Sequence, residues 1–233
     1  MKGKVILSAI PMRLEANDKA EMVNQVLFGE TFDVLTKEDK WSKIKLHHDK
    51  YVGWIDNKQY QIIDKKTEEI KLKNVISKVI EKKKNIFLPM GSIVDFEIKK
   101  TNHSLLQTAK SFLNTPYLWG GRCFLGIDCS GFIQIIFRVH HVALQRDAYQ
   151  QQTQGKRVKF DLFNANNNEK ISIFFQNDAG KIIHVGLAFK EKNKLKIIHA
   201  SGKVRIDLLD ERGIFNEETQ HYSHIFHSIK RII

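Results

Sequence analysis

Residues Thr115–Phe132 read TPYLWGGRCFLGIDCSGF and decide how the second half of this 233-residue chain folds. A Gly-rich loop leads here to Cys129, which lies between Asp128 and Ser130. Apolar residues then recur at three- and four-residue steps, at Phe132, Ile133, Ile136 and Val139. This spacing predicts a helix over about residues 129–142 with one buried face. Asp128 is a preferred N-cap residue, so Cys129 should lie in the first turn of this helix.

A cysteine in the first turn of a helix lies beside unpaired backbone N–H groups and the positive end of the helix dipole. Both favour an anion, so we expect the pKa of the Cys129 thiol to fall from roughly 8.5 toward neutrality. Such a thiolate is a nucleophile, although a cysteine in apolar surroundings is more often a small core residue. A disulfide with Cys123 would consume this nucleophile, and we interpret Cys123 as an incidental free thiol.

A nucleophilic cysteine needs a base, and two histidines follow in segments typical of strands. His184 opens the run HVGLAF, and His199 ends the run LKIIH. The polar residues 190–194 between them predict a hairpin turn. A loop of two or four residues puts both histidines on one face of the sheet, directly or diagonally paired. His184 would then take the thiol proton and His199 would orient it, although a single histidine at a strand end is usually a surface residue.

The runs PYLWGG, GIDCSGF, HVGLAF and IIHASG occur in this order and resemble the NlpC-type cell-wall cysteine peptidases. The resemblance covers about Leu105 to the C-terminus. It implies an α+β fold with a papain-like catalytic domain, in which a helix packs on an antiparallel sheet. It also implies that Cys129 is the nucleophile, His184 the base and His199 the third polar member. The family uses no metal and no cofactor.

Tyr117 matches a tyrosine that helps to bind the developing oxyanion in that family, together with the backbone N–H of Cys129. The alternative role for Tyr117 is simple packing against the neighbouring Trp119. The spaced histidines His221, His224 and His227 lack an Asp, Glu or Cys at ligand spacing, so we interpret them as surface residues of a strand.

The first sixty or so residues alternate short apolar runs with polar turns, which predicts a small all-β barrel. The expected strands are residues 4–7, 21–28, 31–35, 41–46 and 51–55. The phrases FGETFDVL, WSKIKL and YVGWID resemble the bacterial SH3-like (SH3b) domain that precedes the catalytic domain in dipeptidyl-peptidase VI-type members. We therefore expect an SH3-like domain at residues 1–64 and the peptidase domain at 105–233. Residues 65–104 should form a charged linker with a helix, and strands over 86–100 that belong to a truncated second SH3-like lobe.

Those family members are γ-D-glutamyl-L-diamino-acid endopeptidases that act on peptides with a free N-terminal L-Ala. A free ammonium group needs fixed carboxylates, which suits charge-assisted hydrogen bonds. The resemblance implies that the positions corresponding to this subsite are Asp128, Ser130, Arg146, Asp147, Glu15 and Tyr51. Each has a structural alternative: Asp128 as a helix cap, Arg146 and Asp147 as an ion pair, Tyr51 as barrel core and Glu15 as a turn residue.

Composition limits the other possibilities. The chain has 42% hydrophobic residues and three prolines, which is ordinary for a globular protein. Its net charge of +12 is concentrated at residues 65–84 and 190–196 without a basic stripe or nucleic-acid motif, so we expect no nucleic-acid partner. The apolar run Val5–Ile10 is too short for a secretory signal, and no run is long enough for a membrane helix. We therefore expect no membrane partner and a cytoplasmic monomer, or a periplasmic or extracellular protein if a leader has been removed.

Together these features predict a cysteine peptidase that cuts the γ-D-glutamyl to diamino-acid bond of peptidoglycan stem peptides, as in muropeptide recycling. The diamino acid can be diaminopimelate or lysine. The alternatives are an exported hydrolase that remodels intact wall, an inert peptidoglycan-binding module, and an acyltransferase that uses the same Cys and His chemistry.

Overall fold

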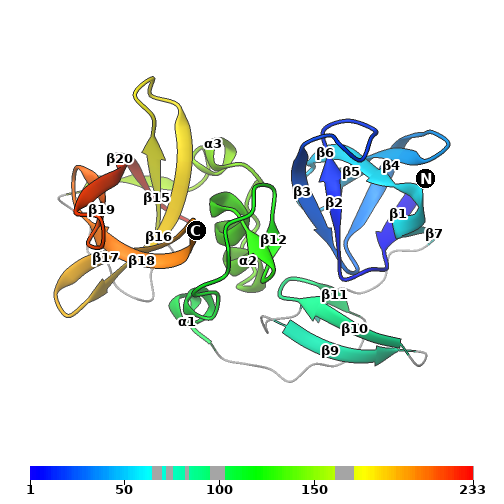
Figure 1. Cartoon of the computed structure of the whole chain (residues 1–233), viewed down its shortest axis with the longest axis horizontal. Helices are drawn as coiled ribbons and strands as arrows, with labels where there is room; N and C mark the ends of the chain where they lie inside the picture. The colour runs from blue at the N-terminus through cyan, green and yellow to red at the C-terminus, as the bar shows by residue number, and fades with distance from the viewer. Residues whose placement is uncertain (65–69, 72–75, 82–83, 95–102, 161–170, 233) are drawn as a thin grey trace. The chain divides into compact units, whose positions relative to one another are not determined.

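The computed structural model describes residues 1–64, 70–71, 76–81, 84–94, 103–160 and 171–232 (Figure 1). The chain forms two compact units. Unit 1 is Met1–Asn102 with Leu118–Gly126, and unit 2 is His103–Tyr117 with Ile127–Ile233. The chain thus leaves unit 2 after Tyr117 and re-enters it shortly before Cys129. The three-part division at residues 64 and 104 stays a prediction.

Unit 1 is built on an antiparallel sheet with the order β3-β2-β6-β5-β4-β1-β7. Its strands are β1 (Lys2–Val5), β2 (Ala9–Arg13), β3 (Met22–Leu27), β4 (Thr31–Lys37), β5 (Trp41–Leu46), β6 (Val52–Asp56) and β7 (Tyr60–Ile63), with a 3-10 turn, η1 (Asn57–Gln59), before β7. Alternate residues of β5 and β6 are buried, as expected for strands with one face on a core. That core comprises Val5, Ile10, Met12, Val26, Phe32, Ile44, Leu46, Ile55 and Tyr60. The expected all-β domain is confirmed, and β2 and β7 are strands that the sequence does not predict.

Two short strand pairs follow in unit 1. β8 (Ile70–Lys71) pairs with β11 (Ile93–Val94), and β9 (Ile76–Glu81) pairs with β10 (Lys84–Pro89). The helix expected between residues 65 and 84 is wrong for the described part of that segment, where β-branched Val and Ile favour strands. The strands expected over residues 86–100 are confirmed for β10 and β11, and residues 95–102 lie outside the described ones. That they form a second SH3-like lobe stays a prediction.

The segment Leu118–Gly126 is fixed in unit 1 by a buried ion pair. Both nitrogens at the end of the Arg122 guanidinium lie 3.0 Å from the carboxylate oxygens of Glu30, and both side chains are 0% exposed. The backbone N–H of Arg122 also donates to Gln25 Oε1 at 2.7 Å, and its guanidinium donates to the Gln25 carbonyl at 2.7 Å. Trp119 Nε1 donates to Glu21 at 2.6 Å. Trp119 within the PYLWGG motif and Arg122 directly after it therefore bond to residues of the N-terminal barrel.

Unit 2 contains a second antiparallel sheet with the order β14-β20-β15-β16-β17-β18-β19. β20 also pairs with β19, so the strands from β15 to β20 close into a barrel. The strands of this sheet are β14 (Lys156–Val158), β15 (Ile171–Gln176), β16 (Ile182–Glu191), β17 (Lys194–Ser201), β18 (Lys203–Leu209), β19 (Gly213–Asn216) and β20 (His221–Arg231). A separate two-stranded ladder, β12 (Arg122–Cys123) with β13 (Gly126–Ile127), lies in the segment where the chain passes from unit 1 back to unit 2. The helices are α1 (Leu105–Lys110), α2 (Cys129–Val139) and α3 (Ala148–Gln151).

Helix α2 packs on β16 and β17, which confirms the papain-like arrangement of a helix on an antiparallel sheet (Figure 1). It begins at Cys129, as predicted, and ends at Val139, because His140 is its C-cap and His141 has a φ of 63°. Every residue of α2 is buried, although the sequence predicts only one buried face. The polar Gln134 is accommodated because its Nε2 donates to the Leu144 carbonyl at 3.1 Å.

None of the described helices is both long and apolar enough to cross a membrane.

Candidate active site

Cys129 is held at the first turn of α2 by the cap that Asp128 provides. Asp128 Oδ1 accepts a hydrogen bond from the Gly131 N–H at 2.6 Å. The Cys129 side chain is buried, and its sulfur accepts hydrogen bonds from the backbone N–H groups of Val185 and Ser130. Since Val185 directly follows His184 on β16, the hydrogen bond brings the candidate nucleophile to the strand that carries the candidate base.

The expected acidification of the thiol is wrong for the resting protein. Burial, and next the charge of Asp128, raise the pKa of Cys129 to about 12. The two backbone hydrogen bonds and the Arg146 charge lower the pKa, but they do not compensate for desolvation. The dipole argument fails first because burial desolvates the thiolate, and second because the carboxylate that caps the helix is itself a negative charge beside the sulfur. Cys129 is therefore a neutral thiol at pH 7.

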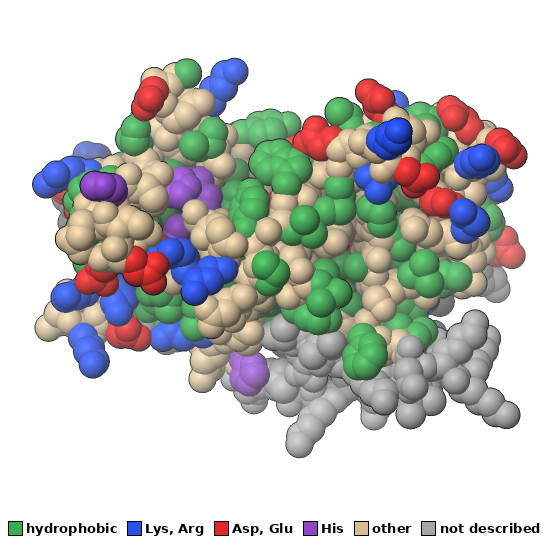
Figure 2. All heavy atoms as spheres, in the orientation of Figure 1, with side chains coloured by type: hydrophobic (Ala, Val, Ile, Leu, Met, Phe, Trp, Pro, Cys, Tyr) green, Lys and Arg blue, Asp and Glu red, His purple; other side chains and the backbone are tan. Residues whose placement is uncertain are grey.

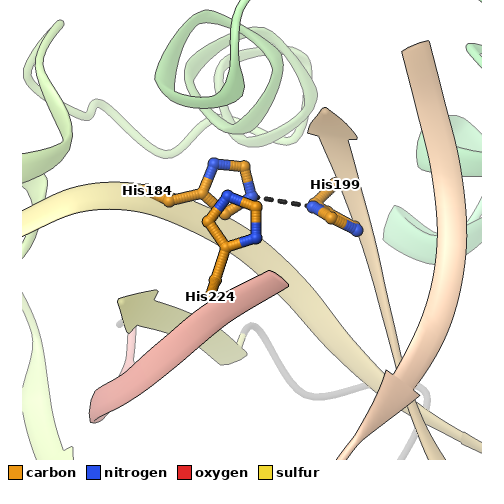
Figure 3. A group of neighbouring side chains, drawn as sticks. All are labelled: His184, His199 and His224. Atoms are coloured by element: carbon orange, nitrogen blue, oxygen red, sulfur yellow. Dashed lines mark hydrogen bonds between the residues drawn. The ribbon is translucent and has the colours of Figure 1, made fainter. Parts of the chain in front are cut away.

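His184 and His199 lie on neighbouring strands as predicted. The turn of the hairpin contains two residues, Lys192 and Asn193, both with positive φ. His199 pairs with Gly186, so His184 is its diagonal neighbour on the same face. His184 Nε2 lies 2.7 Å from His199 Nδ1, and the other ring nitrogen of His184 points away from His199 (Figure 3). Gly186 leaves the space for this pair, because a Cβ there would lie 3.0 Å from the Cβ of His199.

A third member, Asp207 on β18, follows His199 and was not among the predicted residues. Asp207 Oδ2 lies 2.8 Å from His199 Nε2 and accepts a bond from Arg205 Nε at 2.8 Å. Burial alone would raise the pKa of Asp207, but its hydrogen bonds with His199 and Arg205 outweigh burial and lower that pKa below its usual value. The sequence carried a usable signal, because the turn at Gly202 starts another hairpin and puts Asp207 on the face of His199.

The ionised Asp207 fixes the tautomers of both histidines. An ionised carboxylate only accepts, so His199 must carry its proton on Nε2. Burial lowers the pKa of His199, so its ring is neutral and its Nδ1 accepts from His184 Nε2–H. Burial, and next the charges of His199 and His224, lower the pKa of His184 well below its ordinary value. His184 is therefore neutral with an unprotonated Nδ1, which is the form that a general base requires.

His224 on β20 belongs to this cluster, and its interpretation as an ordinary surface residue is wrong. Its ring stacks on His184 with centroids 3.9 Å apart and an interplanar angle of 23°. Burial, and next the charge of His199, lower the pKa of His224 to about 4. The sequence could not show this contact, because it depends on β20 returning beside β15 and β19.

Asp128, Ser130 and Arg146 form a buried polar cluster next to Cys129. Arg146 Nη1 donates to Asp128 Oδ1 at 3.0 Å and to Ser130 Oγ at 2.9 Å, and Arg146 Nη2 donates to Asp128 Oδ2. Asp128 thus caps α2 and also pairs with Arg146. Asp147 is the N-cap of α3, and its N–H donates to Gln150 Oε1 at 3.2 Å. The substrate-binding roles of these residues stay predictions.

Tyr117 lies close enough to Cys129 and Asp128 for their charges to affect the pKa of its phenol. Burial, and then Cys129 and Asp128, raise the pKa of Tyr117 above its usual value, so the phenol is protonated and can donate a hydrogen bond. Its backbone N–H donates to the Gly202 carbonyl at 2.9 Å, which fixes the chain just before it leaves unit 2. Its role at the oxyanion stays a prediction.

Glu15 and Tyr51 lie in unit 1. Glu15 is exposed and accepts a hydrogen bond from Asn17 Nδ2 at 3.4 Å, as a turn residue would. Tyr51 is half-buried and packs against the barrel core. Their predicted part in substrate binding stays a prediction.

Known proteins resemble both parts of the chain. Residues 12–59 match the bacterial dipeptidyl-peptidase Sh3 domain, and residues 114–223 match the NlpC/P60 family. A gamma-D-glutamyl-L-lysine dipeptidyl-peptidase of Bacillus cereus (strain ATCC 10987 / NRS 248) is 25% identical over 248 residues, which cover 84% of this chain and 73% of the relative. A protein of the same name from Bacillus subtilis (strain 168) is 39% identical over 89 residues, 38% of this chain, and the chain spans only 29% of that relative's length.

Solved structures agree on the fold. An NlpC/P60 family protein from Bacillus cereus ATCC 10987 has a TM-score of 0.80 at 18% identity and covers 99% of each chain. An NlpC/P60 endopeptidase from Photobacterium damselae subsp. piscicida has a TM-score of 0.72 at 14% identity, over 99% of this chain and 72% of that one. At these identities the likeness shows the fold alone. The two family matches, together with the ordered motifs around Cys129, His184 and His199, show that this chain combines an SH3 domain of the bacterial dipeptidyl-peptidase type with an NlpC/P60 domain that follows it.

Proposed function

We propose that the protein is a cysteine peptidase that hydrolyses the γ-D-glutamyl to diamino-acid bond in short peptidoglycan peptides with a free N-terminal L-Ala. The observation that carries this proposal is the hydrogen-bonded series Asp207, His199 and His184, next to the buried Cys129. The names of the Bacillus relatives support the choice of bond.

The reaction begins from a neutral thiol and a neutral imidazole. Because burial disfavours a free thiolate, the proton moves from Cys129 to His184 Nδ1 while the sulfur attacks the γ-carbonyl carbon of D-Glu. The charge that develops on the carbonyl oxygen is bound by the backbone N–H of Cys129 and the Tyr117 hydroxyl. His199 stabilises the imidazolium, because its Nδ1 accepts the bond from His184 Nε2 and the negative Asp207 lies behind it.

The tetrahedral intermediate collapses when His184 returns its proton to the amine of the leaving diamino acid. The acyl group then remains on Cys129 as a thioester. Water attacks this thioester while His184 takes one proton from it, and that proton returns to the sulfur when the dipeptide leaves. Atoms balance as the hydrolysis of one amide bond by one water molecule.

We assign recognition of the free ammonium group to carboxylates of Asp128, Asp147 and Glu15, with Ser130, Arg146 and Tyr51 as supporting polar groups. The cytoplasm is the proposed location, because peptides with a free N-terminal L-Ala arise when wall fragments are taken apart.

The test is hydrolysis of two synthetic tripeptides, L-Ala-γ-D-Glu-meso-diaminopimelate and L-Ala-γ-D-Glu-L-Lys, followed by mass spectrometry. We expect release of the L-Ala-γ-D-Glu dipeptide, no reaction with the N-acetylated tripeptides and no activity in Cys129→Ala. Turnover that persists in Cys129→Ala, or none in the wild type, would refute the proposal. Release of fragments from intact sacculi, together with the protein in an extracytoplasmic fraction, would instead support the wall-remodelling alternative.

A further inference from the structure

His184, His199 and His224 form a cluster of three potential ligands that catalysis as described does not fully use. One ring nitrogen from each lies within 4.8 Å of the others, and the three rings come from β16, β17 and β20 (Figure 3). Imidazole nitrogen is the ligand that Zn²⁺ takes most readily apart from thiolate, and sites with three histidines and a fourth open position are common. His224 has no part in the proton transfers proposed above.

Each ring has one nitrogen that can bind an ion once the hydrogen bond between His184 and His199 is broken. His199 is anchored at Nε2 by Asp207, and this carboxylate-histidine arrangement typically orients the other nitrogen of a metal ligand. His224 Nδ1 lies 2.9 Å from the Ser223 hydroxyl, which leaves its Nε2 as the ligand atom. His184 offers Nε2, the atom that faces His199.

We propose that His184, His199 and His224 bind one Zn²⁺ ion, and that this ion reversibly blocks the peptidase site. Three nitrogens on a tetrahedral zinc lie about 3.3 Å apart, given Zn–N bonds of about 2.0–2.1 Å. The His184–His199 pair, now 2.7 Å apart, must therefore open slightly, and His224 must turn out of its stack so that its lone pair converges. His224 is only half-buried, and Figure 2 shows histidine side chains among the surface atoms of unit 2.

Inhibition follows from the tautomers and rests on the proposed function. Zinc takes the lone pair of His184 Nε2, so the proton now on Nε2 has to move to Nδ1 through solvent, without net release. Nδ1 is the nitrogen that accepts the thiol proton, and once protonated in the neutral, metal-bound ring it accepts none. The zinc also occupies the position of the hydrogen bond through which His199 stabilises the imidazolium. Metal binding therefore removes the base while Cys129 stays intact.

Binding is tested apart from catalysis in the full chain carrying Cys129→Ala, by isothermal titration with ZnCl₂. We expect one zinc per chain, and at least about tenfold weaker binding when His224→Phe is added, since one of three protein ligands is lost. The matched control is His221→Phe, an exposed histidine of the same strand, which should bind like its parent. Equal zinc affinity with and without His224→Phe, or no binding at micromolar zinc, would overturn the site.

The inhibitory part is tested on the active enzyme with the tripeptide substrates. Zinc should abolish turnover, EDTA should restore it, and His224→Phe should shift the inhibitory zinc concentration at least about tenfold when each protein is normalised to its own metal-free rate. An unshifted inhibitory concentration would mean that zinc acts at Cys129 instead, and would refute this mechanism. A metal-free wild type without turnover would reject the proposed peptidase and leave the titration of the Cys129→Ala protein as an independent result.

Discussion

Replacing Asp207 with asparagine should strongly lower kcat, although the two side chains have almost the same shape. Asp207 receives three bonds: from His199 Nε2 and Arg205 Nε on Oδ2, and from Arg205 Nη2 at 2.9 Å on Oδ1. Asparagine has one oxygen, so its NH₂ group faces either Arg205 Nη2, or both Arg205 Nε and His199 Nε2. In either orientation the NH₂ group meets one N–H of Arg205, which cannot accept, and the carboxylate charge that stabilises the imidazolium is lost. In the second orientation asparagine donates to His199 Nε2, because a neutral histidine can change tautomer.

In that second orientation the change of tautomer passes from His199 to His184, the general base. His199 would then carry its proton on Nδ1 and donate to His184 Nε2, so the proton of His184 would be on Nδ1. We expect kcat to fall by about 10² to 10⁴, the upper limit being the loss caused by the wrong tautomer in an Asp-to-Asn triad variant. Because Asp207 acts through His199, it is a positioning residue.

The assay combines tripeptide turnover with ¹⁵N spectra of the histidine rings, which report tautomers directly. The control is Arg205→Met, which removes the ion pair but keeps the carboxylate for His199, and should lose less than about tenfold in kcat. A kcat of Asp207→Asn within fivefold of wild type would refute the reasoning, and the ring spectra show which orientation the asparagine takes.

Three further outcomes follow from buried charges and the thiol. Arg122→Met should destabilise unit 1 by about 3–5 kcal/mol, because the buried Glu30 carboxylate loses its arginine counter-charge, and adding Glu30→Leu should restore much of that loss. Tryptophan emission under urea measures both variants, and equal stability of the single and double variants would contradict this. The rate of alkylation of Cys129 by iodoacetamide should rise about tenfold per pH unit from neutral pH upward without a plateau, since burial raises the thiol pKa to about 12. A midpoint below 7 would instead reveal a thiolate–imidazolium pair. Asp128→Asn should lower the stability of unit 2 by about 3–5 kcal/mol, because Arg146 is 1% exposed and loses its counter-charge, and a loss below 1 kcal/mol by circular dichroism would contradict this.

Tryptophan emission is specific in the first of these experiments because Trp41, Trp54 and Trp119 all belong to unit 1. The tryptophan signal therefore follows unit 1, whereas circular dichroism reports both units, and unit 2 is the part of its change that tryptophan emission does not follow.

The sequence is sufficient where function depends on neighbours along the chain or across one hairpin. The start of α2 at Cys129 follows from the Asp128 cap, and the meeting of His184 with His199 follows from the short turn between their strands. The sequence is insufficient where a property of the site depends on how several helices and strands pack together. The thiol pKa reflects desolvation by the whole fold, and the stack of His224 on His184 depends on how the barrel closes.

The placement of Leu118–Gly126 limits how far the SH3 domain can be treated as a detachable module. Deleting residues 1–102 would keep the catalytic motifs but would remove Glu30, the partner of the Arg122 guanidinium. It would also remove Met22, which packs so closely on Gly120 that a Cβ at Gly120 would lie 2.3 Å from the Met22 carbonyl oxygen. This segment joins Tyr117 to Ile127, just before Cys129. Such a truncation would therefore leave the stretch of chain that leads to the nucleophile without the contacts that hold it. A chimaeric protein that replaces the SH3 domain should therefore also replace residues 118–126, which that domain holds in place.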